Sequence, residues 1–334
     1  MRSRLARAAV AVLLVGAMAI GLSGCAELIS GGEATGRSVD LPPPSEDIIR
    51  PFDIQPLVQP RRKFFGAALE DAPSSMAGAD KYAELVGKRP DLLEYYAAWG
   101  DDYNTAGVHK AWKTGAMTVV SWEPDDTTIA DIADGKSDAY VKRYAESVRN
   151  LNLPIVMSFA DEMNGHWEKW GTKYVKAADY VRAWKHVHDV FVDAGAVNVI
   201  WAWSPNIINP VKKIDIHDYY PGDDYVDWVG MVGYFTHDQP YTFDAVFGPT
   251  IAKVRTFTRK PLLVLETAAD TDPKRRSAIV SLFKGIKARK DVVGFIWFDY
   301  SKRADWRLVA DTPALAEFKR LAADDTFGFD VRKP

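Results

Sequence analysis

The sequence of 334 residues contains a single cysteine, Cys25, so no disulfide bond can form within one chain. It also lacks an excess of positive charge, since 42 Lys and Arg residues stand against 45 Asp and Glu residues. The resulting net charge of −3 argues against a nucleic-acid-binding protein, which usually carries a basic face. Because no internal repeat or low-complexity tract follows the N-terminal region, the chain is typical of a globular protein.

Several motifs that would indicate a particular chemistry are absent from the sequence. No G-x-S-x-G motif is present, so the sequence offers no serine nucleophile elbow. No glycine-rich phosphate-binding turn follows the first apolar run. His186 and His188 lie two positions apart on an expected helix, and this spacing directs them to different faces. We therefore expect neither a catalytic metal nor a cofactor.

The N-terminus has the pattern of a bacterial lipoprotein signal. Three arginines precede an apolar run at residues 8–22, which is short for a membrane span and typical of a signal peptide. The run ends in Leu-Ser-Gly-Cys, which resembles a lipobox and implies cleavage after residue 24 and lipidation of Cys25. An ordinary secretory signal with a chance cysteine is the alternative. We expect residues 1–24 to be removed and the protein to be held outside the cytoplasm by a lipid anchor in the cell membrane.

Proline is concentrated after this signal, and residues 25–60 have few apolar side chains to bury. Such a segment is expected to run extended, as a tether between the lipidated Cys25 and a folded domain. The folded domain is expected over residues 61–325, followed by a short tail at 326–334. The sequence does not indicate an oligomeric state, and we assume a monomer.

Apolar segments rich in β-branched and aromatic residues alternate with amphipathic ones. Eight of them are candidate strands, at residues 63–69, 92–99, 116–122, 154–160, 198–204, 227–235, 261–267 and 292–300. Nearly all are continuous apolar runs, as expected for parallel strands that are covered on both faces. Helical patterns between them span residues 137–152, 176–195, 241–258 and 272–290. This alternation predicts a closed (β/α)8 barrel in a single α/β domain; the rival is an open doubly wound sheet, which usually carries a phosphate-binding turn.

Active sites in such barrels lie at the carboxyl ends of the strands. Glu162 and Glu266 follow two of the predicted strands, and aromatic residues end several others. Glycoside hydrolysis requires two such carboxyl groups, one to donate a proton and one to attack or to activate water. A single strand-end Glu is more often part of a salt-bridge network, so the pairing is what favours catalysis. For Glu123, a structural role and a contact with substrate fit the sequence equally well. Asp299 is expected to order a loop.

The strand-four segment Ala-Asp-Glu-Met-Asn-Gly-His-Trp-Glu-Lys-Trp-Gly, residues 160–171, resembles the signature of glycoside hydrolase family 26. Further similar motifs lie at residues 121–124, 198–206, 219–235 and 294–308, so the resemblance covers about residues 62–322. The family consists of (β/α)8 enzymes that act with retention, mainly β-mannanases with some mixed-linkage glucanases and xylanases. The resemblance implies a polysaccharide substrate for this chain.

By this resemblance, Glu162 matches the general acid/base and Glu266 the nucleophile, and Tyr234 matches a tyrosine beside the nucleophile. Trp167 and Trp297 match tryptophans that face the substrate. Among the other strand-end residues, we expect contacts with sugar from Asp161, Trp122 and Trp203.

Two positions depart from the family pattern, which has His where Asp161 stands and Arg where Ser158 stands. Loss of that arginine would remove a positive charge near the nucleophile and tend to raise its pKa. Because both glutamates are kept, we favour an active enzyme with altered specificity. A glycan-binding lipoprotein without turnover and a transglycosylase remain the alternatives.

Overall fold

The computed structural model describes residues 50–238 and 240–334. The predicted signal peptide at 1–24, the lipidation site Cys25 and the tether up to residue 49 lie outside the described residues.

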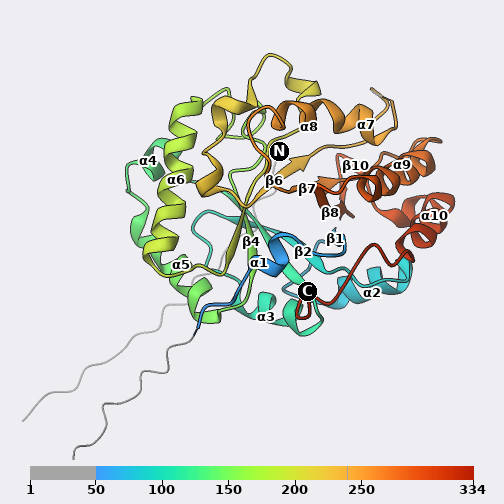
Figure 1. The fold of residues 1–334 in the computed structure, drawn as a ribbon, viewed down its shortest axis with the longest axis horizontal. Helices are drawn as coiled ribbons and strands as arrows, with labels where there is room; N and C mark the ends of the chain where they lie inside the picture. The colour runs from blue at the N-terminus through green and yellow to red at the C-terminus, as the bar shows by residue number, and fades with distance from the viewer. Residues whose placement is uncertain (1–49, 239) are drawn as a thin grey trace, which may run out of the picture. The chain divides into compact units, whose positions relative to one another are not determined.

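Eight parallel strands close into a barrel in which each strand pairs with its neighbours in chain order, β1 to β8, and β8 pairs with β1. Figure 1 shows these strands at the centre, with the helices arranged around them. The prediction of a (β/α)8 barrel is thus confirmed. The strands are β1 Phe64–Ala68, β2 Leu92–Ala98, β3 Met117–Glu123, β4 Ile155–Phe159, β5 Val199–Trp203, β6 Trp228–Val232, β7 Leu262–Thr267 and β8 Val292–Phe298.

The helices cover the outer face of the barrel because each presents an apolar stripe to the strands. In α6, the buried residues recur at the spacing of one helical face. They are Tyr180, Ala183, Trp184, Val187 and Phe191. The helices are α1 Gln55–Val58, α2 Ala77–Val86, α3 Thr105–Lys113, α4 Ile129–Ala133, α5 Asp138–Leu151, α6 Ala177–Asp193, α7 Phe243–Val246, α8 Gly248–Val254, α9 Arg275–Ala288 and α10 Thr312–Ala322.

The helix predicted over residues 241–258 is two short helices instead, α7 and α8. α7 begins with a cap from Thr242, whose hydroxyl accepts a hydrogen bond from the backbone N–H of Ala245. Pro249 lies in the first turn of α8, where its missing N–H costs little. A proline at this position favours the start of a new helix, so the continuous pattern is broken there.

Residues 55–58 and the C-terminal tail both pack against the barrel, outside the predicted bounds of 61–325. Leu57 in α1 is fully buried, and the indole Nε1 of Trp228 donates a hydrogen bond of 2.9 Å to the carbonyl oxygen of Val58. In the tail, Phe327 and Val331 are buried. Apolar side chains on both segments drive this packing, which closes the amino-terminal end of the barrel.

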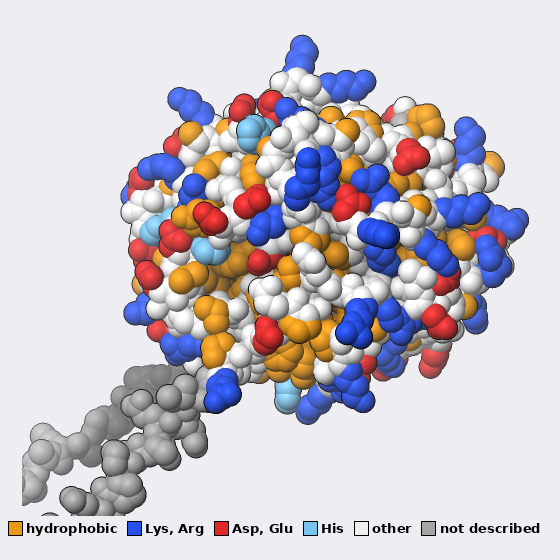
Figure 2. All heavy atoms as spheres, viewed as in Figure 1, with side chains coloured by type: hydrophobic (Ala, Val, Ile, Leu, Met, Phe, Trp, Pro, Cys, Tyr) orange, Lys and Arg blue, Asp and Glu red, His pale blue; other side chains and the backbone are white. Residues whose placement is uncertain are grey.

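No helix within the described residues is long and apolar enough to span a membrane. On the face shown in Figure 2, basic and acidic side chains are interspersed, with apolar side chains visible between them.

Candidate active site

The two predicted catalytic glutamates stand at the carboxyl ends of β4 and β7. β4 ends at Phe159, and the backbone at Ala160 and Glu162 takes positive φ values of 49° and 53°. The alternation of a regular strand therefore ends at Phe159 and does not extend to Glu162. A left-handed conformation is unfavourable for residues with a Cβ. It is held by a 2.8 Å hydrogen bond from the backbone N–H of Glu162 to the carbonyl oxygen of Ser204, just past β5.

The carboxyl group of Glu162 is fixed by two donors. Trp167 Nε1 donates to its Oε2 at 2.7 Å, and Asn206 Nδ2 donates to its Oε1. Asn206 is itself held by Asn164, because the two residues exchange hydrogen bonds of 2.8 and 2.9 Å between side chain and backbone. Gly165 lets the indole of Trp167 fold back, since a Cβ there would lie 2.5 Å from the ring. The Met-Asn-Gly-x-Trp segment thus positions the proton-donor candidate.

Glu266 on β7 accepts hydrogen bonds from two tyrosine hydroxyls, one on each of its carboxylate oxygens. Tyr96 on β2 donates to Oε2, and Tyr234, just past β6, donates to Oε1. Tyr234 was predicted to lie beside this carboxyl group, and the structure places it there. Tyr96 was not predicted. The paired donors orient both oxygens of Glu266 and favour its ionised form.

The pKa values of the two glutamates are set by different neighbouring groups. Burial, and next the charge of Glu266, raise the pKa of Glu162 to about 7, against the two hydrogen bonds that favour its carboxylate. Burial also raises the pKa of Glu266, while the hydrogen bonds from Tyr234 and Tyr96 and the charge of Lys302 oppose that rise. Unequal environments for two carboxyl groups are the usual basis for an acid and a base at one site. Glu162 is suited to hold a proton near neutral pH.

Three further acids surround this pair. Glu94 on β2 is fully buried and accepts a 2.8 Å hydrogen bond from the hydroxyl of Ser121. Burial, followed by the charge of Glu266, raises its pKa well above the ordinary value. Burial, followed by the charge of Glu162, does the same for Asp161. Burial raises the pKa of Glu123, at the end of β3, to about 7.

Within the described residues, no group of three or more His, Cys, Asp or Glu is arranged to hold a metal ion.

The charges of Glu162, Glu123 and Glu266 all act on Asp161 and raise its pKa. Its side chain is only partly accessible, and its buried Oδ1 has no hydrogen-bond partner in the described part of the chain. Ser158, which occupies the position of the family arginine, is fully buried and forms a 2.8 Å hydrogen bond with Ser204. β4 therefore presents a neutral, inward-facing hydroxyl there.

Three of the predicted sugar-binding tryptophans do not line the cleft. Trp122, Trp203 and Trp297 are all fully buried. Trp122 stacks on Tyr144 of α5 with ring centroids 4.3 Å apart, and Trp297 packs on Phe318 of α10 at 5.3 Å. Alternation along each strand turns these indoles outward toward the helices, so their predicted contact with substrate is wrong for this structure.

Trp203 is buried against Tyr220 and Phe257, with ring centroids 5.1 and 6.2 Å away. Trp167 does reach the site, through its hydrogen bond to Glu162. Trp306, which was not predicted, lies beside Tyr234 with ring centroids 4.8 Å apart and is partly exposed.

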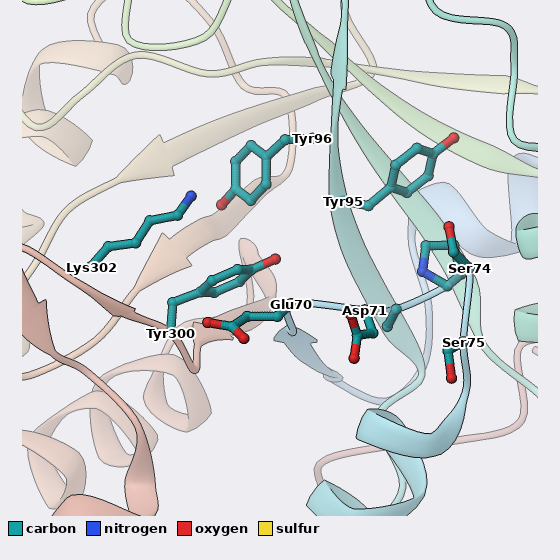
Figure 3. Close-up of a pocket in the computed structure, with 10 residues that line it drawn as sticks. Glu70, Asp71, Ser74, Ser75, Tyr95, Tyr96, Tyr300 and Lys302 are labelled. Carbon is teal, nitrogen blue, oxygen red and sulfur yellow. The ribbon is translucent and has the colours of Figure 1, made fainter. Parts of the chain in front are cut away.

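A pocket of about 600 Å³ is lined by residues of β2 and by residues that follow β1 and β8 (Figure 3). Tyr96 contributes to its wall and donates a hydrogen bond to the carboxylate of Glu266. The other lining residues are Glu70, Asp71, Ala72, Pro73, Ser74, Ser75, Tyr95, Tyr300 and Lys302. In Figure 3, the hydroxyl of Tyr95 is turned away from Tyr96.

The fold and the site define the protein as a (β/α)8 barrel with a pair of differently held carboxyl groups at the carboxyl ends of its strands. The model for glycosyl hydrolase family 26 matches residues 104–260. Together, this match and the similar proteins described next support glycoside hydrolase family 26 as the family of this chain.

Endoglucanase H of Acetivibrio thermocellus is 28% identical over 268 residues, which cover 76% of this chain and 30% of that protein. The mannan endo-1,4-beta-mannosidase of Bacillus subtilis is 30% identical over 202 residues, covering 48% of this chain and 55% of the enzyme. The chain thus spans between about a third and about half of the length of these relatives. The catalytic domain of the GH26 endo-beta-1,4-mannanase of Bacillus sp. JAMB-750 has the same fold, with a TM-score of 0.64, 16% identity and coverage of 83% of this chain and 89% of that one.

Proposed function

We propose that the protein is a retaining endo-β-glycosidase that hydrolyses a β-linked polysaccharide, with β-1,4-mannan as the first candidate and mixed-linkage glucan and xylan as related ones. The observation that carries this proposal is the unequal environment of Glu162 and Glu266. One carboxyl group has its pKa raised to about 7, and the other accepts two tyrosine hydrogen bonds. The names of the relatives, an endoglucanase and a mannan endo-mannosidase, support the substrate class.

In the first step, a carboxylate oxygen of Glu266 attacks the anomeric carbon and forms an ester bond to the sugar. The bond from the anomeric carbon to the glycosidic oxygen breaks, and Glu162 gives its proton to that oxygen. In the second step, the Glu162 carboxylate takes a proton from water. The water oxygen attacks the anomeric carbon and Glu266 leaves, so the configuration is retained.

The charges around the site favour a neutral polysaccharide over one that contains uronic acids. Glu70 and Asp71 line the adjoining pocket, and Glu123 and Asp161 lie close to the catalytic pair. Lys302 is the one cation among the residues that line the pocket. A uronate placed there would be repelled by the ionised members of this group.

The test is a reducing-sugar assay on mannan, glucomannan, mixed-linkage glucan and xylan, with the wild type, Glu162→Gln and the control Glu84→Gln. Glu84 is exposed on α2. We expect the wild type and the control to release reducing ends from at least one polymer, and Glu162→Gln to lose most of that activity. Binding of a polymer by both the wild type and Glu162→Gln, with no hydrolysis of any polymer, would overturn the proposal. Products longer than the substrate would indicate transglycosylation instead.

We also propose that the mature chain is anchored in the membrane by a lipid on Cys25. The lipobox-like sequence at residues 22–25 supports this proposal. Metabolic labelling with a palmitate analogue should mark the wild type and leave Cys25→Ala unlabelled. An unlabelled wild type that is recovered in the soluble fraction would contradict it.

A further inference from the structure

A short hairpin follows β8 and bends back over the catalytic end of the barrel. Its two strands, β9 Ser301–Lys302 and β10 Ala304–Asp305, pair antiparallel. Arg303 forms the turn, with a φ of 50°. At the base of the hairpin, the backbone N–H of Trp306 donates to the carbonyl oxygen of Tyr300 at 3.0 Å. These bonds fix the direction in which the hairpin presents its side chains.

Lys302 extends from this hairpin across a group of aromatic rings. Its Nζ lies 5.4 Å from the ring centroid of Tyr96 and 4.9 Å from that of Tyr300. A third ring, that of Phe298, lies 5.9 Å away. Figure 3 shows the ammonium end of Lys302 directed toward Tyr96, above Tyr300. A cation held over aromatic faces at these distances is attracted by the negative faces of the rings.

The same hairpin leads to the second tyrosine that holds Glu266. Trp306, directly after β10, packs its ring against Tyr234 at a centroid distance of 4.8 Å. Lys302 therefore contacts one of the two tyrosines that donate to Glu266, and Trp306 contacts the other. The hairpin and the Trp306 that follows it thus contact both hydrogen-bond donors of the nucleophile candidate.

The charged groups near Glu266 come from several strands, and most of them are acidic. The charge of Glu266 raises the pKa of four nearby acids, which are Glu94 of β2, Glu123 of β3, and Asp161 and Glu162 after β4. Lys302 acts in the opposite sense and lowers the pKa of Glu266, as it also does for Glu123. At position 158, a neutral serine adds no positive charge from β4.

We propose that Lys302 is a positioning residue for Glu266, holding the Tyr96 donor in place and supplying positive charge beside the nucleophile from the β9–β10 hairpin. This inference rests on the proposed function for the role of Glu266. It assigns to Lys302 a task that no residue of β4 performs in this chain. Arginine at the same position should perform it in part, because it keeps the charge and the contact with the rings.

The first experiment measures the pKa of Glu266 and does not depend on turnover. Protein labelled with ¹³C at glutamate carboxyl groups is titrated by NMR, and the Glu266 signal is assigned as the one missing from Glu266→Gln. We expect the Glu266 titration to move to higher pH by roughly 0.5–1 pH unit in Lys302→Met, because a neighbouring positive charge is lost. Lys302→Arg should restore most of the wild-type value. Lys290→Met, at an exposed site beyond α9, should leave it unchanged.

The second experiment measures kcat and KM against pH on the polymer that the wild type hydrolyses best. Loss of positioning should lower kcat for Lys302→Met, change KM little, and move the acid limb upward, with recovery in Lys302→Arg. A Lys302→Met protein that unfolds at the wild-type temperature but has an unshifted Glu266 titration would overturn the inference. That result is independent of the proposed function, which fails separately if the wild type hydrolyses none of the polymers.

Discussion

The hydroxyl of Tyr96 on β2 donates a hydrogen bond to the carboxylate of Glu266 on β7, although the two residues are 170 positions apart in the chain. Tyr234 donates to the other oxygen of the same carboxylate. The closed barrel brings the ends of these strands together, so the nucleophile candidate is held from two sides. Its proton-donor counterpart, Glu162, is held by Trp167 and by Asn206.

Replacing Tyr96 by Phe should lower kcat/KM by roughly 10–100-fold, because a hydrogen bond to a charged group contributes about 1.5–3 kcal/mol. Loss of the donor should also raise the pKa of Glu266, and the acid limb of the pH profile should move upward. Tyr95→Phe is the matched control, since its hydroxyl is turned away from Tyr96 (Figure 3). Equal effects of the two substitutions would show that the hydroxyl of Tyr96 has no special role.

The alkaline limb of kcat/KM should fall near pH 7, because the general acid must be protonated and the pKa of Glu162 is raised to about 7. The hydrogen bond from Trp167 favours the Glu162 carboxylate and so lowers this pKa. Trp167→Phe should therefore raise the pKa and move the alkaline limb to higher pH. Trp112→Phe, at a tryptophan of α3 that packs on Phe52, serves as the control. A limb that moves downward in Trp167→Phe would contradict this assignment.

Trp306 and Trp297 lie close in sequence and should respond in opposite ways to replacement by Phe. Trp306 is partly exposed beside Tyr234, so Trp306→Phe should reduce kcat/KM and leave the thermal unfolding temperature nearly unchanged. Trp297 is fully buried under α10, so Trp297→Phe should lower the free energy of unfolding by roughly 1–3 kcal/mol. Calorimetry and steady-state kinetics on both variants distinguish the two roles. A kinetic defect in a fully folded Trp297→Phe would contradict this and indicate that Trp297 contributes to substrate binding.

The C-terminal tail should be required for stability, although it lies far from the catalytic residues in sequence. Phe327 is 1% exposed and packs against Phe283 with ring centroids 4.9 Å apart. Phe327→Ala should lower the free energy of unfolding by about 3–5 kcal/mol, as expected for a large buried side chain. Val309→Ala, at a residue that is 53% exposed, should have little effect in the same urea titration. A small effect of Phe327→Ala would indicate that the tail packs only loosely.

The barrel could be predicted because parallel strands covered on both faces are continuous apolar runs, and their order along the chain defines the topology. The same property explains the errors at the tryptophans. A continuous apolar run does not reveal which of its two faces points into the barrel. Ser121, Trp122 and Glu123 are consecutive, and only the inward-facing members reach the site. Hence Trp122 was assigned to the cleft from its place at the strand end alone.

Tyr96 and Asn206 were missed for different reasons. Glu94 and Tyr96 are two positions apart in an apolar strand, so a buried acid there already indicated which face of β2 points inward. That signal could have identified Tyr96. Asn206 reaches Glu162 through a reciprocal pair of bonds with Asn164, and such a contact between separate loops has no sequence signature. The positive φ at Glu162 also depends on a bond to Ser204, which only the folded barrel provides.

The most direct test of the account is to trap the glycosyl-enzyme. The wild type is incubated with activated 2-deoxy-2-fluoro glycosides of β-mannobiose, β-cellobiose and β-xylobiose, digested, and analysed by peptide mass spectrometry. We expect that at least one of the three labels Glu266, and that Glu266→Gln remains unlabelled at residues 262–267. A label on a different carboxyl group would contradict the assignment of Glu266 as the nucleophile. Hydrolysis with inversion of configuration, seen by NMR of the fresh products, would contradict the covalent mechanism itself.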